Sequence, residues 1–154
     1  MRTSIKALAL AAAVLVSLTA CDKPKPEVTV FSGARSVHAP AECWMDGAGA
    51  CSVNAQSVPT ELTATSGATL GISVDSDVAE AGWRPVFVIN GQEQNLTTGF
   101  LHRRYWKMAY PEVALTSLAG APLQLVVYAV TDDQKSVRGY WNFSLNNDPA
   151  LDNA

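Results

Sequence analysis

A strict alternation of apolar and polar side chains near the end of the chain constrains the fold more than any other feature. In the segment 137–145, VRGYWNFSL, the odd-numbered positions are apolar or glycine and the even-numbered positions are mostly polar. Successive side chains of a β-strand point to opposite faces, so this period of two predicts a half-buried antiparallel strand. The preceding apolar run at 123–130, LQLVVYAV, predicts a central strand. The polar loop at 131–136 then predicts a hairpin between them.

Turn-forming residues divide the rest of the chain into short β-rich segments. Gly, Pro, Asn or Asp recur every eight to twelve residues, and segments such as 27–31 and 68–74 again alternate. The apolar segment PVFVI leads into Asn90-Gly91, which suits a two-residue hairpin because a type I′ turn needs positive φ at both central positions. We expect the return strand at 94–101. A single helical turn is possible within 77–85.

This rhythm predicts the fold class. Seven to nine short strands in about 120 residues are typical of an all-β domain built as a sandwich or barrel. We predict a single antiparallel β-sandwich, Ig-like in the number and spacing of its strands.

The first twenty residues have the composition of a secretory signal rather than of a folded segment. Two basic residues precede a run of 14 uncharged residues at 7–20, mostly Ala, Leu and Val. A membrane-spanning helix needs about 20 residues, so this run better suits the core of a signal. The residues Leu18-Thr19-Ala20-Cys21 resemble the lipobox of bacterial lipoproteins. In that pattern the cysteine receives a diacylglyceryl group and becomes the first mature residue. The alternatives are an ordinary signal with an incidental cysteine, or an apolar helix of the domain, which would be expected to be amphipathic.

The lipobox divides the chain into four parts. We expect a signal peptide at 1–20, a lipidated Cys21 with a tether at 21–26, the β-sandwich at 27–145 and a polar tail at 146–154. One acyl chain anchors only marginally, whereas two chains, at about 0.8 kcal/mol per buried CH2, hold stably. The sequence therefore predicts an extracytoplasmic protein on the cell membrane, and the prolines of the tether predict a stiff, solvated spacer.

Charge excludes one class of partner. Two of the eleven basic residues lie in the signal, so the mature chain carries nine basic and fourteen acidic residues and a net charge of −5. Nucleic-acid binding calls for a basic footprint. We therefore expect no nucleic-acid partner.

Two cysteines remain beside the lipobox cysteine. Cys43 and Cys51 bracket the segment WMDGAGA, whose glycines allow the chain to fold back. Disulfides persist outside the cytoplasm, so we predict a structural bridge between them. The alternative is a metal or redox pair, although a redox pair is usually Cys-x-x-Cys and zinc needs two further ligands.

The sequence holds no motif of a catalytic or cofactor-binding site. His38 and His102 lie far apart, and no Gly-x-Ser-x-Gly elbow accompanies them. A soft-metal site formed by both histidines with Met45 and Met108 stays open as an alternative, as does a hard-cation site at the acidic segment 75–80. We expect no enzyme activity, no cofactor and no metal.

The segment 102–110, HRRYWKMAY, combines basic and aromatic residues. It gathers three of the nine mature basic residues within six positions, together with two aromatic residues. If this segment is a strand, every second side chain points toward the core and the side chains between them are exposed. The exposed side chains are predicted to be Arg103, Tyr105 and Lys107. This combination suits an anionic or sugar-bearing envelope polymer; the alternative is a strand edge that Lys and Arg protect against unwanted pairing.

The order of these motifs resembles small actinobacterial cell-envelope lipoproteins that are grouped as a domain of unknown function. The motifs are the lipobox, CDKPKPEVTV, CWMDGAGAC and GISVDSDVAEAGW. The resemblance covers most of the mature chain and implies a cell-envelope lipoprotein, with no catalytic residue carried over. We predict a lipid-anchored, noncatalytic interaction or accessory module that binds an anionic envelope polymer or an envelope protein. The alternatives are a small-ligand or metal carrier and an enzyme of unknown class.

Overall fold

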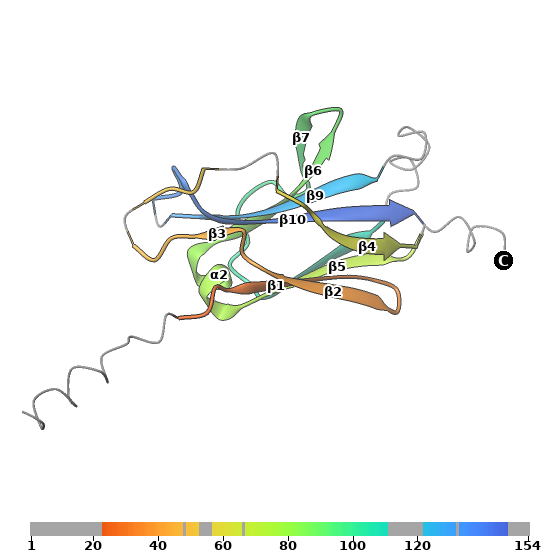
Figure 1. Cartoon of the computed structure of the whole chain (residues 1–154), viewed down its shortest axis with the longest axis horizontal. Coiled ribbons are helices and arrows are strands. Elements are labelled where there is room, and N and C mark those ends of the chain that lie inside the picture. Colours follow the sequence, from red (N-terminus) through yellow and green to blue (C-terminus); the bar gives the residue numbers. More distant parts are fainter. Residues whose placement is uncertain are drawn as a thin grey trace, which may run out of the picture.

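The computed structural model describes residues 23–47, 49–52, 57–65, 67–110, 122–131 and 133–147. Within these ranges two sheets pack face to face, with one short helix at one end (Figure 1). The prediction of an all-β sandwich is confirmed. The elements are β1 (Glu27–Ser32), β2 (Arg35–Pro40), β3 (Cys43–Trp44), β4 (Thr60–Ala64), β5 (Thr69–Val74), α2 (Ser76–Ala81), β6 (Trp83–Ile89), β7 (Gln92–Asn95), β8 (Tyr105–Ala109), β9 (Leu123–Val130) and β10 (Val137–Asn147).

The chain passes between the sheets in an Ig-like order. The first sheet has the strand order β2-β1-β5-β8, and the second has β3-β10-β9-β6-β7 with β4 also on β10. Ig-like sandwiches place strands B and E in one sheet and strands C, F and G in the other. Here β5 and β8 take the places of B and E, and β6, β9 and β10 take those of C, F and G. All pairs are antiparallel except β4, which runs parallel to β10.

The core lies between the sheets and is built from the alternating residues that the sequence indicates. Trp141, Phe143 and Leu145 of β10 are fully buried, as the period of two predicts. Trp83 of β6 is also fully buried, and its indole Nε1 donates to the carbonyl of Arg103 at 2.8 Å. This bond joins the second sheet to the segment that leads into β8.

Strand β10 is buried on both faces, and the expectation of a half-buried strand is wrong. Its even-numbered residues Tyr140, Asn142 and Ser144 are only 4–6% exposed. Tyr140 belongs to a second apolar cluster on the outer face of this sheet; its buried members are Cys51, Val86, Val126, Tyr128 and Tyr140. Asn142 accepts a hydrogen bond from Gln124 Nε2 at 3.0 Å and donates one to Ser57 Oγ at 3.3 Å. The strand also continues to Asn147, two residues beyond the expected end of the domain.

The hairpins confirm one local prediction and correct another. Asn90 and Gly91 have φ values of 53° and 75° and join β6 to β7 in a two-residue turn. The return strand ends at Asn95 instead of extending to residue 101. The chain leaves the sheet because it must cross to β8 in the other sheet, and Leu101 makes only an isolated bridge with Trp83. The expected hairpin between β9 and β10 is present.

The tether beyond Asp22 packs on the domain, although the sequence predicts a solvated spacer. Pro26 is buried, and its carbonyl accepts hydrogen bonds from Ala41 N at 3.0 Å and from the indole of Trp141 at 3.1 Å. Lys25 donates to the carbonyl of Glu42 at 3.3 Å. The segment is held by a tertiary contact, because the Pro26 carbonyl is the hydrogen-bond acceptor for the fully buried indole of Trp141.

Tyr110 follows β8 and carries an unusual buried hydroxyl. The residue is 1% exposed, and its hydroxyl oxygen has no hydrogen-bond partner in the described part of the chain. Burial raises the pKa of Tyr110 to about 12, because the charged phenolate loses its hydration. In the unfolded chain the pKa of tyrosine is about 10.

We expect the Tyr110→Phe variant to be as stable as the wild type or slightly more stable at pH 7, because an unpaired hydroxyl contributes only its desolvation cost. Since the folded pKa is raised, this residue's contribution to stability is complete below the unfolded pKa and falls as pH rises from about 10 to 12. The variant should therefore lose less stability than the wild type over this range. Urea unfolding of wild type and variant at pH 7 and across the range from about pH 10 to 12 measures both effects. If the variant loses more than about 1 kcal/mol of unfolding free energy at pH 7, the hydroxyl is paired in the native protein.

Candidate functional site

The outer face of the first sheet is the surface on which the predicted ligand residues lie. Its inner face packs on the core through Val30, Ile72 and Trp106, among others. Side chains at the alternate positions therefore point to solvent. In register order from β2 to β8, one row across this outer face is Ser36, Phe31, Gly71 and Lys107, and the next is His38, Thr29, Ser73 and Tyr105.

Two aromatic rings from different strands meet on this face. Phe31 of β1 and Tyr105 of β8 have parallel rings, with centroids 5.6 Å apart and planes 2° apart. The Phe31 ring lies over Gly71 of the intervening strand, where any Cβ atom would overlap the ring. Glycine at this position therefore lets one ring reach across a strand to the other. Tyr105 is still 43% exposed. We call Phe31 and Tyr105 the aromatic pair.

Two of the three predicted surface residues lie on this face. Tyr105 and Lys107 alternate with the buried Trp106, as the sequence predicts, and both are exposed. Arg103 is exposed as well, but it lies in the bend before β8, not within the strand. The strand starts later because the backbone there is held from outside the sheet, by the bond from Trp83 to the carbonyl of Arg103. Arg103 therefore flanks the face at the entrance to β8.

Several residues of this face were missed by the sequence reasoning. Phe31 occupies a position of β1 whose neighbours in phase, Glu27 and Thr29, are polar, and an aromatic residue in the polar phase of an alternating strand is the signal that could have found it. His38 and Ser73 come from strands that the sequence does not pair with β8. Only the strand register brings them into one surface.

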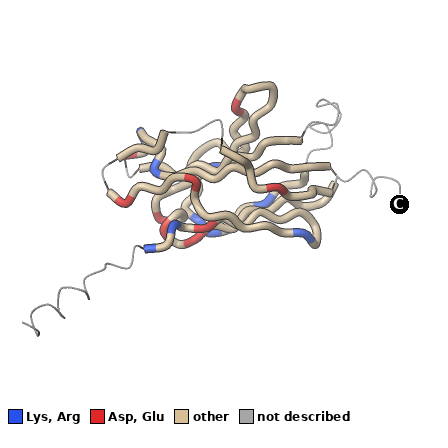
Figure 2. The backbone as a smooth tube through the Cα atoms, viewed as in Figure 1, with Lys and Arg blue, Asp and Glu red and all other residues tan. Residues whose placement is uncertain are grey.

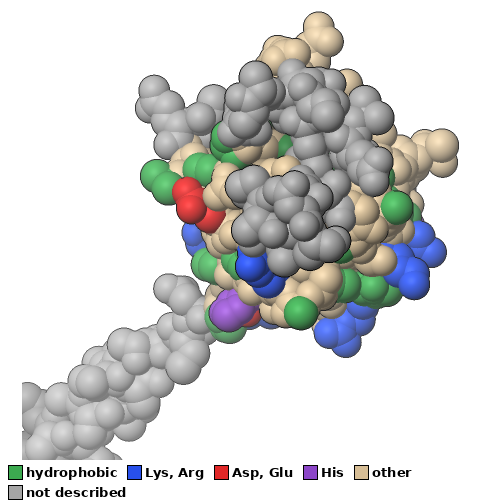
Figure 3. All heavy atoms as spheres, turned by 90° about the vertical axis from the view of Figure 1, so that its right-hand side faces the viewer, with side chains coloured by type: hydrophobic (Ala, Val, Ile, Leu, Met, Phe, Trp, Pro, Cys, Tyr) green, Lys and Arg blue, Asp and Glu red, His purple; other side chains and the backbone are tan. Residues whose placement is uncertain are grey.

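The charges around the face favour an anion. Lys107 lies at the centre of β8, the edge strand of this face, whereas the acidic Glu27 lies at the start of β1 beside the tether. Figure 2 shows that basic and acidic residues elsewhere are spread over strands, turns and helix. Figure 3 shows basic side chains mainly along the lower and right-hand parts of the end that faces the viewer.

The predicted disulfide is present. Cys43 and Cys51 are bonded, with Cα atoms 6.0 Å apart. The loop is tied to β10 by backbone bonds, from Met45 N to the carbonyl of Arg138 at 2.9 Å and from Cys51 N to the carbonyl of Val137 at 2.8 Å.

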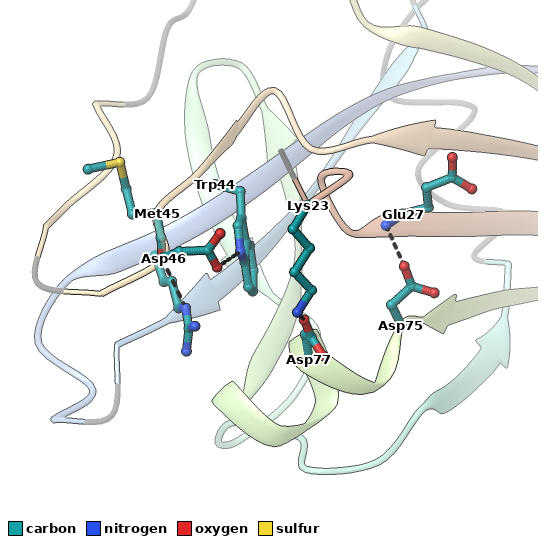
Figure 4. A network of polar contacts seen from close by, with 8 residues as sticks. Lys23, Glu27, Trp44, Met45, Asp46, Asp75 and Asp77 are labelled. Carbon is teal, nitrogen blue, oxygen red and sulfur yellow. Dashed lines mark hydrogen bonds and ion pairs between the residues drawn. The ribbon is translucent and has the colours of Figure 1, made fainter. Parts of the chain in front are cut away.

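Side chains of the same loop extend this contact. The guanidinium of Arg138 lies 4.8 Å from the ring centre of Trp44, and the Trp44 indole donates to Asp46 Oδ1 at 2.8 Å (Figure 4). The loop therefore packs along the β10 edge of the second sheet, with its disulfide in the apolar cluster on the outer face and Trp44 against the inner core.

The acidic segment has structural partners. Asp75 Oδ2 accepts a hydrogen bond from Glu27 N at 2.8 Å, and Asp77 pairs with Lys23 of the tether (Figure 4). Within the described ranges no three His, Cys, Asp or Glu side chains are grouped as metal ligands would be. The helical turn expected within 77–85 is α2, which begins one residue earlier, at Ser76, and ends at Ala81 with Gly82 as its C-cap.

The described surface has hollows at the disulfide loop and at the tether. One of about 770 Å³ lies between the disulfide loop and the β9–β10 hairpin, and is lined by small and polar residues with Arg138. The other, of about 280 Å³, lies between the tether and the start of α2. Both are separate from the aromatic pair.

The fold and this face define an all-β sandwich with a basic and aromatic sheet surface. Comparisons with known protein families, with curated proteins and with solved structures find nothing that matches this chain. The described residues contain no helix long and apolar enough to cross a membrane. The expected signal at 1–20, the expected lipidation site Cys21 and residues 148–154 of the expected tail lie outside the described residues.

Proposed function

We propose that this protein is a lipid-anchored, noncatalytic interaction module of the bacterial cell envelope. Its anchor is a lipidated Cys21, and its partner is an anionic envelope polymer. The lipobox-like Leu-Thr-Ala-Cys sequence supports the anchor. The resemblance to small actinobacterial envelope lipoproteins supports the location.

The observation that carries the binding proposal is the exposure of Tyr105 and Lys107 side by side on one sheet face, with Arg103 at the strand entrance. The rest of the mature chain is acidic in balance, with fourteen acidic against nine basic residues overall. An anion that approaches the molecule elsewhere meets a net negative charge, whereas here it meets a local cluster of cations. Binding of this kind weakens as salt screens the charges, over a distance of about 8–10 Å at physiological ionic strength.

We expect the Arg103→Ser/Lys107→Ser variant to lose most of its binding to purified cell-wall and membrane fractions, because it removes the cation of the face, Lys107, and the flanking cation, Arg103. Pull-down by wild type and variant, at low and at physiological salt, measures the loss. Both side chains are exposed, so the melting temperature should stay nearly unchanged.

A Lys25→Ser/Lys135→Ser variant removes the same net charge from the tether and the β9–β10 loop and serves as the control. It should bind almost like the wild type. Equal binding by the face variant and the wild type would contradict the proposal. Equal losses in both variants would point to overall charge instead of a site.

A further inference from the structure

We infer that the aromatic pair is a stacking platform for a sugar ring, and that the polymer bound by this face is an acidic glycan. This inference rests on the proposed function and narrows its ligand class. In it, one pyranose ring lies against Phe31 and Tyr105, and the carboxylate of the same or the next sugar pairs with Lys107.

The first argument is the shape of the aromatic surface. The two rings are stacked, with planes 2° apart and centroids 5.6 Å apart, and the stack reaches across three adjacent strands from β1 to β8. Phe31 thereby supports the Tyr105 ring, which is 43% exposed and available for a further stacking contact. The faces of aromatic rings are electron-rich, and the C–H groups on one face of a pyranose carry the complementary positive charge. A ring that served only to fill the core would lie on the inner face, where Trp106 of the same strand is 9% exposed.

The second argument is that the chain keeps space for this arrangement. A Cβ atom on Gly71 would overlap the Phe31 ring, so the ring position depends on glycine in the middle of a strand. Glycine within a strand interior weakens it and often marks a close approach of another group. Here the group is the aromatic ring, which is held over the strand toward Tyr105.

The third argument is the ring of polar groups around the pair. The neighbouring outward positions carry hydroxyl groups on short side chains, with one imidazole. These residues are Thr29, Ser36, His38, Thr69 and Ser73. Short hydroxyl side chains leave the face flat and offer both donors and acceptors, which are the partners that sugar hydroxyls need. A face that bound only a simple polyanion would need cations and no such border.

The fourth argument concerns charge. Lys107 lies opposite Gly71 in the register and two residues along the strand from Tyr105, so its side chain starts from the strand position next to the platform. A carboxylate on a sugar that stacks on the pair is therefore within reach of this cation. This selects acidic over neutral glycans, since a neutral sugar would make only the stacking and hydroxyl contacts.

Three polymers separate these contributions. Polygalacturonate presents acidic sugars, its methyl ester presents the same sugars without charge, and polyglutamate presents carboxylates without sugars. Binding by the full-length protein in neutral detergent can be measured by calorimetry at low salt. We expect polygalacturonate to bind at least tenfold more tightly than either of the other polymers.

Three variants locate the platform. Gly71→Ala adds no charge and removes no ligand group, but its Cβ displaces the Phe31 ring. Tyr105→Ser removes the second, exposed ring. We expect each to weaken polygalacturonate binding at least fivefold while leaving polyglutamate binding unchanged. Lys107→Ser should weaken binding of both acidic polymers.

The controls match each change. Gly99→Ala adds a Cβ at an exposed position with nothing within 4 Å, and Lys135→Ser removes a cation from another loop. Both should bind like the wild type. Equal affinity for polygalacturonate and polyglutamate would overturn the glycan inference alone and leave the anionic-polymer proposal standing. The glycan inference would also be overturned if polygalacturonate failed to bind, or if Gly71→Ala and Tyr105→Ser both bound it as the wild type does. The anionic-polymer proposal is tested separately, by binding of the Arg103→Ser/Lys107→Ser variant to envelope fractions.

Discussion

The Cys21→Ser variant is expected to leave the membrane fraction completely and to appear as soluble or unprocessed protein. Without the sulfur there is no site for the diacylglyceryl group, and the lipobox-like sequence is no longer a substrate for lipoprotein processing. Fractionation of cells followed by immunoblotting measures the change.

The disulfide variant described next is the control for this experiment, because it changes two cysteines of the folded domain and keeps Cys21. It should stay in the membrane fraction. Recovery of the Cys21→Ser protein in membranes with its signal removed would contradict lipid anchoring at this residue.

Replacing Cys43 and Cys51 by alanine is expected to have the largest effect on stability among the proposed variants. Closing a loop of nine residues contributes about 2.5 kcal/mol in the chain-entropy model. The variant also loses packing, because Cys51 is 8% exposed and belongs to the apolar cluster that covers the outer face of β9 and β10. Urea unfolding should therefore show a loss of roughly 3–5 kcal/mol.

Labelling of the cysteines tests the same bridge directly. The unreduced, unfolded protein should take up no thiol reagent at Cys43 or Cys51, and reduction should make both reactive. Full labelling without reduction would show that the bridge is absent from the native protein. A stability loss well below about 2 kcal/mol would mean that the loop is held mainly by its backbone bonds to β10.

The sequence was informative wherever a feature depends on local pattern. The period of two at 137–145 reflects the inward direction of Trp141 and Phe143, and the turn at Asn90-Gly91 follows from the backbone freedom of those two residue types. The alternation could not show that the outer face of β10 is covered too. Whether Tyr140 meets water or the disulfide loop depends on a segment almost a hundred residues earlier.

The candidate site also has residues that a local sequence pattern predicts and residues that it does not. Tyr105 and Lys107 follow from the alternation with Trp106, which is a property of one strand. Phe31 could not be assigned to the same surface, because it meets Tyr105 only through the register of β1 with β5 and of β5 with β8. Strand register is a long-range property that one sequence does not reveal.

The packing of the tether limits how far the anchored domain reaches. Two hydrogen bonds hold the Pro26 carbonyl to the body of the sandwich. Pro26 is the fifth residue after Cys21, and an extended chain spans at most about 3.6 Å per residue. With the proposed lipid on Cys21, Pro26 is therefore confined to within about 18 Å of the anchored residue. If the proposed anchor holds the protein in this way, the proposed polymer would have to approach the membrane surface to be bound.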